Sequence, residues 1–210
     1  IDAYSFVEML DGVQLLEKSK SFTAKDSRKL KAWFSHFLKW LLSHPQAIEE
    51  SDQKNNHAIA YDVQVAAYSL YTGNRKVFSD VLAYFPKRRI ATQIAPDGSQ
   101  PHELRRTLAF GYSQYNLHHI IDLMLMVKHQ GLDFHKYGIC DEHSFFKAMD
   151  FLAPYMGKSV KLWPYQQISG WEEKQQEMAC DFYRAYTLDE SRKDYLHIYQ
   201  QVRIPIVRSP

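Results

Sequence analysis

Apolar residues that recur at three- and four-residue steps constrain this chain most strongly. The clearest run contains Leu30, Trp33, Phe34, Phe37, Leu38 and Leu41. On a helix with 3.6 residues per turn, these side chains form one stripe that has to be buried against another element. No alternating pattern of the kind that predicts a β-strand competes with it over a comparable length. The sequence therefore predicts an all-α protein.

Proline, glycine and asparagine signals divide the chain into helices. We predict them over residues 4–18, 30–41, 56–71, 75–85, 102–110, 115–130, 142–153, 172–187 and 192–200. Pro45 ends the second helix and Gly73-Asn74 ends the third. Residues 93–101 hold two prolines and an Asp-Gly pair and predict a loop, residues 154–170 are irregular, and residues 204–210 are extended. Helices joined by short loops pair as antiparallel hairpins, which build bundles, solenoids or α/α toroids.

Length and charge narrow the class of protein. With 210 residues, a single domain over residues 1–210 is expected. The net charge of +2 argues against a general nucleic-acid binder but leaves room for an anionic polymer, since a few cations in a cleft suffice to bind one. We expect no membrane partner, because no apolar stretch approaches the roughly 20 residues of a spanning helix, and no metal, because no metal-ligand spacing is present. The short basic run Lys87–Arg89 is expected to be solvated.

The first candidate for a functional site is the start of the helix predicted from residue 56. Asn55 or Asn56 is suited to cap this helix, because its side-chain oxygen can accept from an open backbone N–H. The helix then places His57, Tyr61 and Gln64 on one face, at positions i, i+4 and i+7. Polar groups on one face of an otherwise apolar helix indicate a lined cleft, although a capped helix with a surface histidine fits the same residues.

The second candidate lies in residues 96–117. It holds Glu103, Arg105, Arg106, Tyr112 and Tyr115. On an uninterrupted helix Arg106 and Tyr112 lie about 240° apart, whereas Arg105 and Tyr112 share a face. Helical geometry alone therefore favours Arg105 as the partner of Tyr112. Arg106 shares a site with Tyr112 only if the helix breaks between them, for which Gly111 is a suitable place.

The third candidate is the Pro- and Gly-rich segment 162–172, which carries Trp163, Tyr165 and Trp171. Flat aromatic rings stack on the C–H faces of sugars, so such a loop can form the rim of a glycan site. The same residues equally fit a loop pinned onto the core, and the sequence does not decide between the two.

Three segments in this order, NNHAIAYDVQ, PDGSQPHELRRT and FGYSQYNL, resemble the central pattern of the alginate lyase family. The resemblance covers residues 1–165 and is closer to the branch that acts on glucuronan or mannuronan. It implies an incomplete (α/α) toroid with a cleft along one side, and an N-terminal portion of the family that we expect this chain to lack. It also implies a periplasmic or secreted enzyme, without a cofactor, that cleaves a β-1,4-linked uronan by β-elimination.

The resemblance also assigns catalytic residues. The family's Asn-His pair falls on Asn56 and His57, the arginine of its E-L-x-R-T pattern on Arg106, and its tyrosine on Tyr112. We therefore prefer Arg106 to Arg105 and predict a helix end or kink between Arg106 and Tyr112. Asn56, His57 and Arg106 are expected to neutralise the substrate carboxylate. Tyr112 is expected to act as acid and base, with His57 sharing the role of base.

Further residues near these segments are expected to bind the substrate, namely Tyr61, Gln64, Gln100, Glu103, Tyr115, Trp163 and Tyr165. Two other readings stay open: a non-catalytic glycan-binding relative of the lyases, and a helical solenoid that binds other proteins. A glycoside hydrolase would need two opposed carboxylates. Glu103 and Glu172 are available for that role, but nothing in their context selects them. The sequence does not indicate the oligomeric state.

Overall fold

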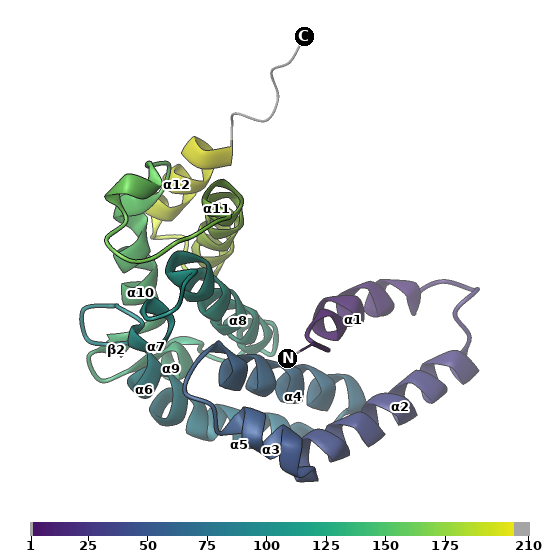
Figure 1. Ribbon diagram of the computed structural model, residues 1–210. Helices are drawn as coiled ribbons and strands as arrows, with labels where there is room; N and C mark the ends of the chain where they lie inside the picture. Colours follow the sequence, from purple (N-terminus) through teal and green to yellow (C-terminus); the bar gives the residue numbers. More distant parts are fainter. Residues whose placement is uncertain (1, 204–210) are drawn as a thin grey trace. The chain divides into compact units, whose positions relative to one another are not determined.

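The computed structural model describes residues 2–203, the last of them without its side chain. Over this range helices dominate, joined by loops and by one pair of two-residue strands (Figure 1). The predicted all-α class is therefore confirmed. The chain divides into two compact units, residues 1–85 and 86–210. The single domain expected over residues 1–210 stays a prediction, and the extended segment expected at residues 204–210 lies outside the described part.

The helices of the first unit include a short one, over residues 45–51, that was not predicted, and the second helix begins at residue 24 instead of residue 30. They are α1 (Ser5–Leu16), α2 (Ala24–Ser43), α3 (Pro45–Ser51), α4 (Asn56–Thr72) and α5 (Arg75–Phe85). Thr23 caps α2 by accepting from the backbone N–H of Asp26, whose side chain accepts from Thr23 in return. Pro45 not only ends α2 but also begins α3, because its fixed φ and missing N–H suit the first position of a helix.

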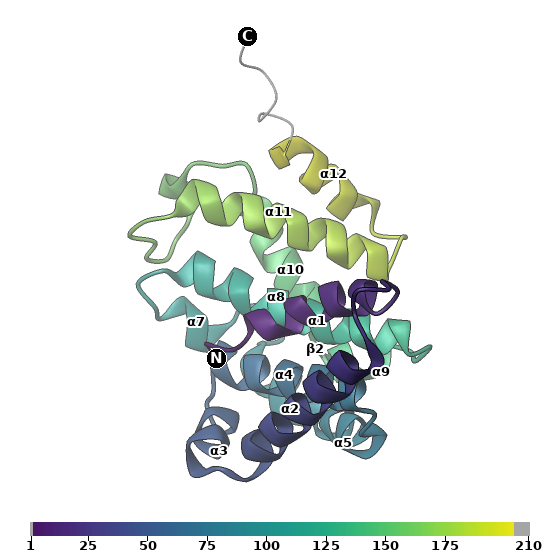
Figure 2. The same ribbon diagram turned by 90° about the vertical axis from the view of Figure 1, so that its right-hand side faces the viewer.

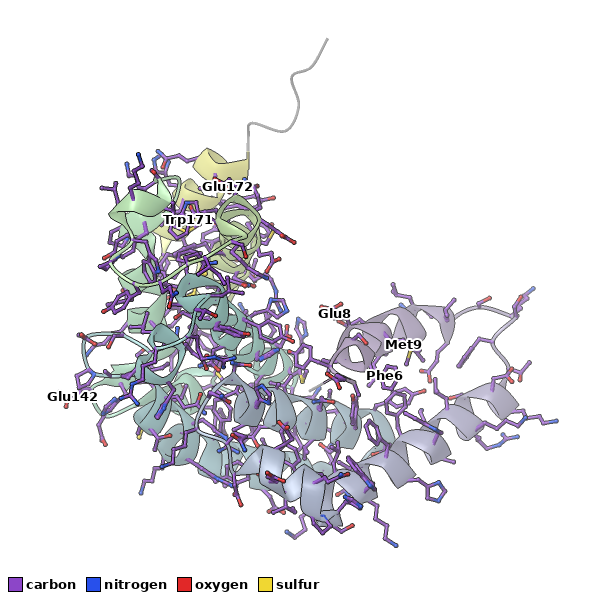
Figure 3. All side chains as sticks on the ribbon, viewed as in Figure 1. Phe6, Glu8, Met9, Glu142, Trp171 and Glu172 are labelled. Atoms are coloured by element: carbon purple, nitrogen blue, oxygen red, sulfur yellow. The ribbon has the colours of Figure 1, made fainter. Side chains whose placement is uncertain are left out.

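Helix α4 forms the centre of the first unit and contacts α1, α2, α3 and α5. It runs antiparallel to α2. The hydroxyl of Tyr61 donates to the carbonyl of Leu41 at 2.8 Å, and further along the pair the rings of Tyr68 and Phe34 lie 4.9 Å apart. Phe6 of α1, labelled in Figure 3, meets Phe34 edge-on. Because helices cover α4 on several sides, most of its residues are buried.

Gly73 ends α4 in the left-handed conformation, with φ of 80°, as its place in the sequence predicts. The chain then reverses into α5. The hydroxyl of Tyr84 in α5 donates to the carboxylate of Asp62 in α4 at 2.9 Å, which shows that the two helices are antiparallel. This hairpin confirms the predicted helices over residues 56–71 and 75–85.

The second unit contains longer helices separated by short irregular elements. Its elements are η1 (Pro86–Ile90), α6 (Ala91–Gln93), α7 (Pro101–Leu104), α8 (Ala109–His129), α9 (His135–Gly138), β1 (Ile139–Cys140), β2 (His143–Ser144), α10 (Phe145–Leu152), η2 (Ala153–Tyr155), η3 (Val160–Leu162), α11 (Trp171–Leu188) and α12 (Lys193–Arg203). Among the described helices of the chain, none is both long and apolar enough to cross a membrane.

Several predictions for this unit are wrong in detail. The helix expected over residues 142–153 begins at Phe145, because the residues before it pair as the antiparallel strands β1 and β2. The basic run that we expected to be solvated includes Arg89, which is 2% exposed in a π-helical turn. The helices expected over residues 102–110 and 115–130 end and begin elsewhere, at Leu104 and Ala109.

The loop predicted over residues 93–101 is confirmed between α6 and α7. Gly98 has φ of 86°, and a Cβ at this position would lie 2.1 Å from the carbonyl oxygen of Lys147 in α10. Asp97 accepts from the backbone N–H of Ser99 at 2.9 Å, which closes the turn and lowers the pKa of its carboxyl group. The glycine is therefore required both by its backbone conformation and by the close approach to α10.

Helices α8 and α11 lie side by side and run in the same direction (Figure 2). Gln114 of α8 bonds to Asp181 of α11, and further along both helices the ammonium of Lys128 donates to the carbonyl of Thr187. Helix α12 follows antiparallel to α11. Between these two long helices, the chain returns through shorter helices. Repeated helical hairpins produce this kind of parallel packing.

Candidate active site

The start of α4 carries the predicted pair Asn56 and His57. Asn55, and not Asn56, caps the helix: its side-chain oxygen accepts from the backbone N–H of His57 at 3.1 Å. Asn56 is the first helical residue and is 1% exposed. The cap therefore holds the backbone of His57 in place without using the side chain of Asn56.

The ring of His57 is oriented by a carboxylate that the sequence did not reveal. Its Nδ1 lies 2.8 Å from an oxygen of Glu50 in α3, and about a third of each side chain is exposed. A carboxylate accepts a hydrogen bond, so the proton of a neutral ring belongs on Nδ1 and the lone pair on Nε2. Glu50 precedes His57 by seven residues, across the loop that joins α3 to α4, and no pattern in the sequence pairs them.

Tyr61 and Gln64 do not share the surroundings of His57. Tyr61 is 6% exposed and its hydroxyl donates to Leu41 of α2. Gln64 is 2% exposed and donates to the carbonyl of Ala60 at 3.1 Å. Of the three polar groups expected on one face of α4, only His57 is half-buried. Tyr61 and Gln64 lie in the core of the first unit. Their role in substrate binding stays a prediction.

The chain breaks between Arg106 and Tyr112, as the motif required. Helix α7 ends at Leu104 and α8 begins at Ala109, so the break lies in residues 105–108. The carbon Cζ of the Arg106 guanidinium lies 3.9 Å from the centroid of the Tyr112 ring, whereas Arg105 is exposed. The structure therefore brings Arg106 to Tyr112 in a cation–π contact. The break itself is confirmed, but its expected place at Gly111 is wrong.

A segment far along the chain causes this break. The backbone N–H of Ala109 donates to the carbonyl of Gln166 at 2.9 Å, and that of Ile168 donates to the carbonyl of Thr107 at 3.1 Å. These bonds form an isolated antiparallel bridge. The chain leaves the helical path at residues 105–108 and α8 begins at Ala109, and the backbone groups of Thr107 and Ala109 find partners in residues 166–168.

Gln167 completes the start of α8. Its side-chain oxygen accepts from the backbone N–H groups of Phe110 at 3.0 Å and Gly111 at 3.3 Å, and its amide donates to the carbonyl of Ser169 at 2.8 Å. The first N–H groups of a helix have no partner within the helix. Gln167 therefore supplies the cap that the residues before α8 do not provide, one turn or less before Tyr112.

Aromatic contacts hold this loop on the second unit. Trp163 is 5% exposed, and its ring lies 5.4 Å from Phe110, 4.8 Å from Tyr155 and 6.3 Å from Trp171, which Figure 3 labels at the start of α11. The burial of Trp163 fits the alternative in which this loop is pinned onto the core. Tyr165 is 39% exposed and remains at the surface. For both residues, substrate binding stays a prediction.

Gln100 and Glu103 are buried in the second unit, at 2% and 1% exposure. The amide of Gln100 donates to the carbonyl of Ser113 at 3.0 Å and accepts from Asn116 at 2.8 Å. Gln100, the residue directly before α7, is therefore hydrogen-bonded to two positions of α8. These contacts account for a structural role of Gln100, while the predicted binding of substrate by Gln100 and Glu103 stays untested.

A pocket of about 340 Å³ opens beside Tyr112. Its lining residues are Leu108, Gly111, Tyr112, Tyr115, Gln167, Ser169, Gly170, Glu173 and Lys174. The two tyrosines and Gly111 come from α8, the two charged residues from α11, and the others from the residues directly before these two helices. Tyr112 and Tyr115 were predicted site residues, whereas Gln167, Glu173 and Lys174 were not. Gln167 is an amide in a loop, and Glu173 and Lys174 are charges on an amphipathic helix. Nothing in their sequence context indicates a functional site.

Polar side chains tie the two long helices of this pocket together. Asp181 of α11 accepts from Gln114 at 2.6 Å and lies 2.9 Å from Nδ1 of His118, both in α8. Arg184 donates to Asp181 at 3.0 Å and pairs with Asp122. Burial lowers the pKa of His118, but Asp181 and Asp122 raise it by more, so that this pKa lies above its ordinary value. The two helices that carry Tyr112 and Lys174 are therefore joined by paired charges, of which Asp181 is buried and the others are partly buried.

Within the described residues, no group of three histidine, cysteine, aspartate or glutamate side chains is placed to hold a metal ion. The groups with chemistry to offer are instead an oriented imidazole in the first unit, and a guanidinium, a phenol and an ammonium in the second. These are hydrogen-bond donors and proton carriers suited to an anionic ligand.

Comparison with known proteins agrees with the resemblance seen in the sequence. The profile of the family described as alginate lyase matches residues 1–163. A crystal structure of an alginate lyase from Bacteroides ovatus superimposes with a TM-score of 0.92 and is 42% identical; the match covers 100% of this chain and 54% of that one. The present chain thus spans about half of that protein. None of the curated proteins matches it.

The family match extends over most of the chain and includes Asn56, His57, Arg106 and Tyr112, the positions that the sequence motif singled out. The structural neighbour has the same helical fold over the whole length of this chain. The chain therefore belongs to the alginate lyase family.

Proposed function

We propose that this protein is a polysaccharide lyase that cleaves a β-1,4-linked uronic-acid polymer, mannuronan or glucuronan, by β-elimination. The observation that carries the proposal is the contact of Arg106 with the ring of Tyr112 beside an open pocket. A fixed cation next to a phenol places a carboxylate ligand and a proton carrier within reach of one sugar. Membership of the family supplies the reaction class for that arrangement.

The first demand of the reaction is stabilisation of negative charge. A base removes the proton from C5 of the uronate, and the electrons move toward the neighbouring carboxylate, which becomes enolate-like. Donors that bind the carboxylate gain strength as this charge accumulates, so they favour the transition state over the bound substrate. In the proposal Arg106 is the main donor, because a guanidinium holds a carboxylate with two parallel hydrogen bonds. Asn56 and His57 act as further donors.

The second demand is transfer of two protons. One leaves C5, and one reaches the bridging oxygen on C4 as the bond between C4 and that oxygen breaks and the C4–C5 double bond forms. Tyr112 is proposed to protonate the leaving oxygen and to act as base, with His57 sharing the role of base. The hydrogen bond between Nδ1 of His57 and Glu50 supports this second role, because it leaves a lone pair on Nε2.

The test is direct. The protein is incubated separately with mannuronan, glucuronan and guluronan, while the ultraviolet absorbance of the unsaturated product and the number of new reducing ends are followed. We expect both signals to rise together for at least one of the first two polymers. Guluronan, which is not β-linked, serves as the control. New reducing ends without absorbance would indicate hydrolysis, and binding without either signal would indicate a non-catalytic relative.

We also propose that the protein acts in the periplasm or outside the cell. A long, charged polymer does not cross a membrane. An enzyme that shortens such a polymer outside the cytoplasm therefore has to be in the same compartment as the polymer. Fractionation of the producing cells, with the protein followed by antibody, tests this location; recovery with the cytoplasmic fraction alone would contradict it.

A further inference from the structure

The pocket beside Tyr112 has a feature that the proposed reaction does not use. Lys174 of α11 and the tyrosines of α8 line the same cavity of about 340 Å³. We propose that this pocket is a subsite for the uronate next to the bond that breaks, and that Lys174 binds the carboxylate of that sugar. This inference rests on the proposed function and names a residue that selects the substrate.

The place of Lys174 depends on Gly111. A Cβ at Gly111 would lie 3.3–3.6 Å from three carbons of the Lys174 side chain. The glycine thus lets the lysine stem lie across the first turn of α8, directly before Tyr112. A lysine stem packs well on such a surface while its ammonium group stays near water. A side chain at this position would press on the nearest carbon of the lysine stem.

The ammonium group already has one carboxylate partner, which keeps it in place without saturating it. Nζ lies 2.5 Å from Glu177, three residues further along α11, and the two side chains are 30% and 39% exposed. A partly exposed pair of this kind contributes little stability, and an ammonium has three protons to donate. A sugar carboxylate can therefore bind Lys174 while Glu177 still orients it.

The rest of the lining fits a single charged sugar. Tyr112 and Tyr115 are three residues apart on one face of α8, and both line the pocket. Gln167 and Ser169 add polar groups on the loop side. The volume lies at the lower end of the range of about 300–1,000 Å³ found for small-molecule sites, which suits one or two sugar units. Glu173, an exposed residue of the lining, repels an anion and should weaken its binding.

The central variant is Lys174→Met, which keeps most of the stem and removes the charge. Loss of a charged hydrogen bond should raise KM for the cleaved polymer by about tenfold or more, and the effect should shrink at high salt. The value of kcat should change far less, because Lys174 does not touch the reacting bond. Glu173→Gln should shift KM the opposite way. Lys161→Met, an exposed lysine of the same unit, is the matched control and should change neither constant.

Binding is measured in parallel, by calorimetry with mannuronan and glucuronan tetrasaccharides and with their methyl esters. The charged tetrasaccharides should bind Lys174→Met about tenfold more weakly than the wild type, and the esters equally well to both. Equal affinity of the two proteins for the charged forms, or a fall in kcat at constant KM, overturns the inference. A wild type that binds the tetrasaccharides through Lys174 but releases no unsaturated product contradicts the lyase proposal alone. Melting curves show that each variant is folded.

Discussion

The Asn56–His57 segment and the Arg106–Tyr112 segment are built in opposite ways. The first begins a regular helix, and its cap comes from the preceding residue, Asn55. The second spans a break between two helices, and its cap comes from Gln167, 57 residues away from Phe110. One segment is therefore organised by its own neighbours in sequence, and the other by a distant loop.

This difference teaches where each segment is vulnerable. The cap at Asn55 holds the backbone of His57 through a local hydrogen bond. Substitutions near α4 should therefore change the orientation of the His57 ring more than the path of the backbone. The Arg106–Tyr112 contact depends on the bridge between Leu108 and Gln167. A change in the distant loop should therefore reach Tyr112 although it leaves both contact residues intact.

The largest effect is expected from Tyr112→Phe. The ring and its contact with Arg106 remain, but the proton carrier is lost, and a positioned acid or base contributes about 10²–10⁴-fold to rate. The rise in absorbance from unsaturated product should fall by about 100-fold or more, with an unchanged melting temperature. Near wild-type activity would remove Tyr112 from the mechanism and leave His57 as the proton carrier.

The next effect compares two neighbouring arginines. Arg106→Ala should lower kcat/KM by about tenfold or more, since a hydrogen bond to a charged group is worth about 1.5–3 kcal/mol. Arg105→Ala is the control, because this side chain is exposed and follows α7 as its C-cap residue. The reverse order would restore the argument from an unbroken helix and would mean that the contact with Tyr112 is not the one used in catalysis.

A smaller effect is expected in the first segment from Glu50→Gln. An amide can donate to Nδ1 of His57 and so stabilise the tautomer with its proton on Nε2, which is unsuited to act as base. If His57 shares the role of base, kcat should fall by about tenfold, which is less than the loss of a proton carrier. Glu49→Gln, at an exposed neighbouring position, is the matched control. An unchanged kcat for Glu50→Gln would limit His57 to binding the carboxylate.

The smallest effect on chemistry, with a measurable effect on stability, is expected from Gln167→Ala. It removes the acceptor for two N–H groups at the start of α8 and should lower the free energy of unfolding by about 1–2 kcal/mol. Activity should fall by a few fold as Tyr112 loses its support. Gln166→Ala is the control, because the bridge uses the backbone carbonyl of Gln166. Equal melting temperatures for the two variants would show that the distant cap does not matter.

Much of the local structure was predictable from sequence because it depends on near neighbours. The cap at Asn55, the left-handed Gly73 and the turn at Asp97-Gly98 each involve partners within a few residues. Helices α4 and α5 were predicted almost to the residue for the same reason. In the first unit, α3 was not predicted and α2 begins before the predicted stripe. In the second unit, the bounds of α7, α8 and α10 differ from the prediction where these helices begin or end against other segments.

The Asn56–His57 and Arg106–Tyr112 segments show which features the sequence determined and which depended on tertiary structure. By itself, the sequence determined the helical class, the family and the identity of Asn56, His57, Arg106 and Tyr112 as the residues to examine. The choice of Arg106 over Arg105 came from a motif, against helical geometry. Tertiary structure alone decided where the helix breaks, that Glu50 orients His57, and that Lys174 crosses Gly111 into the pocket. The reason is physical: each of these depends on a partner from another element, and periodicity describes one element at a time.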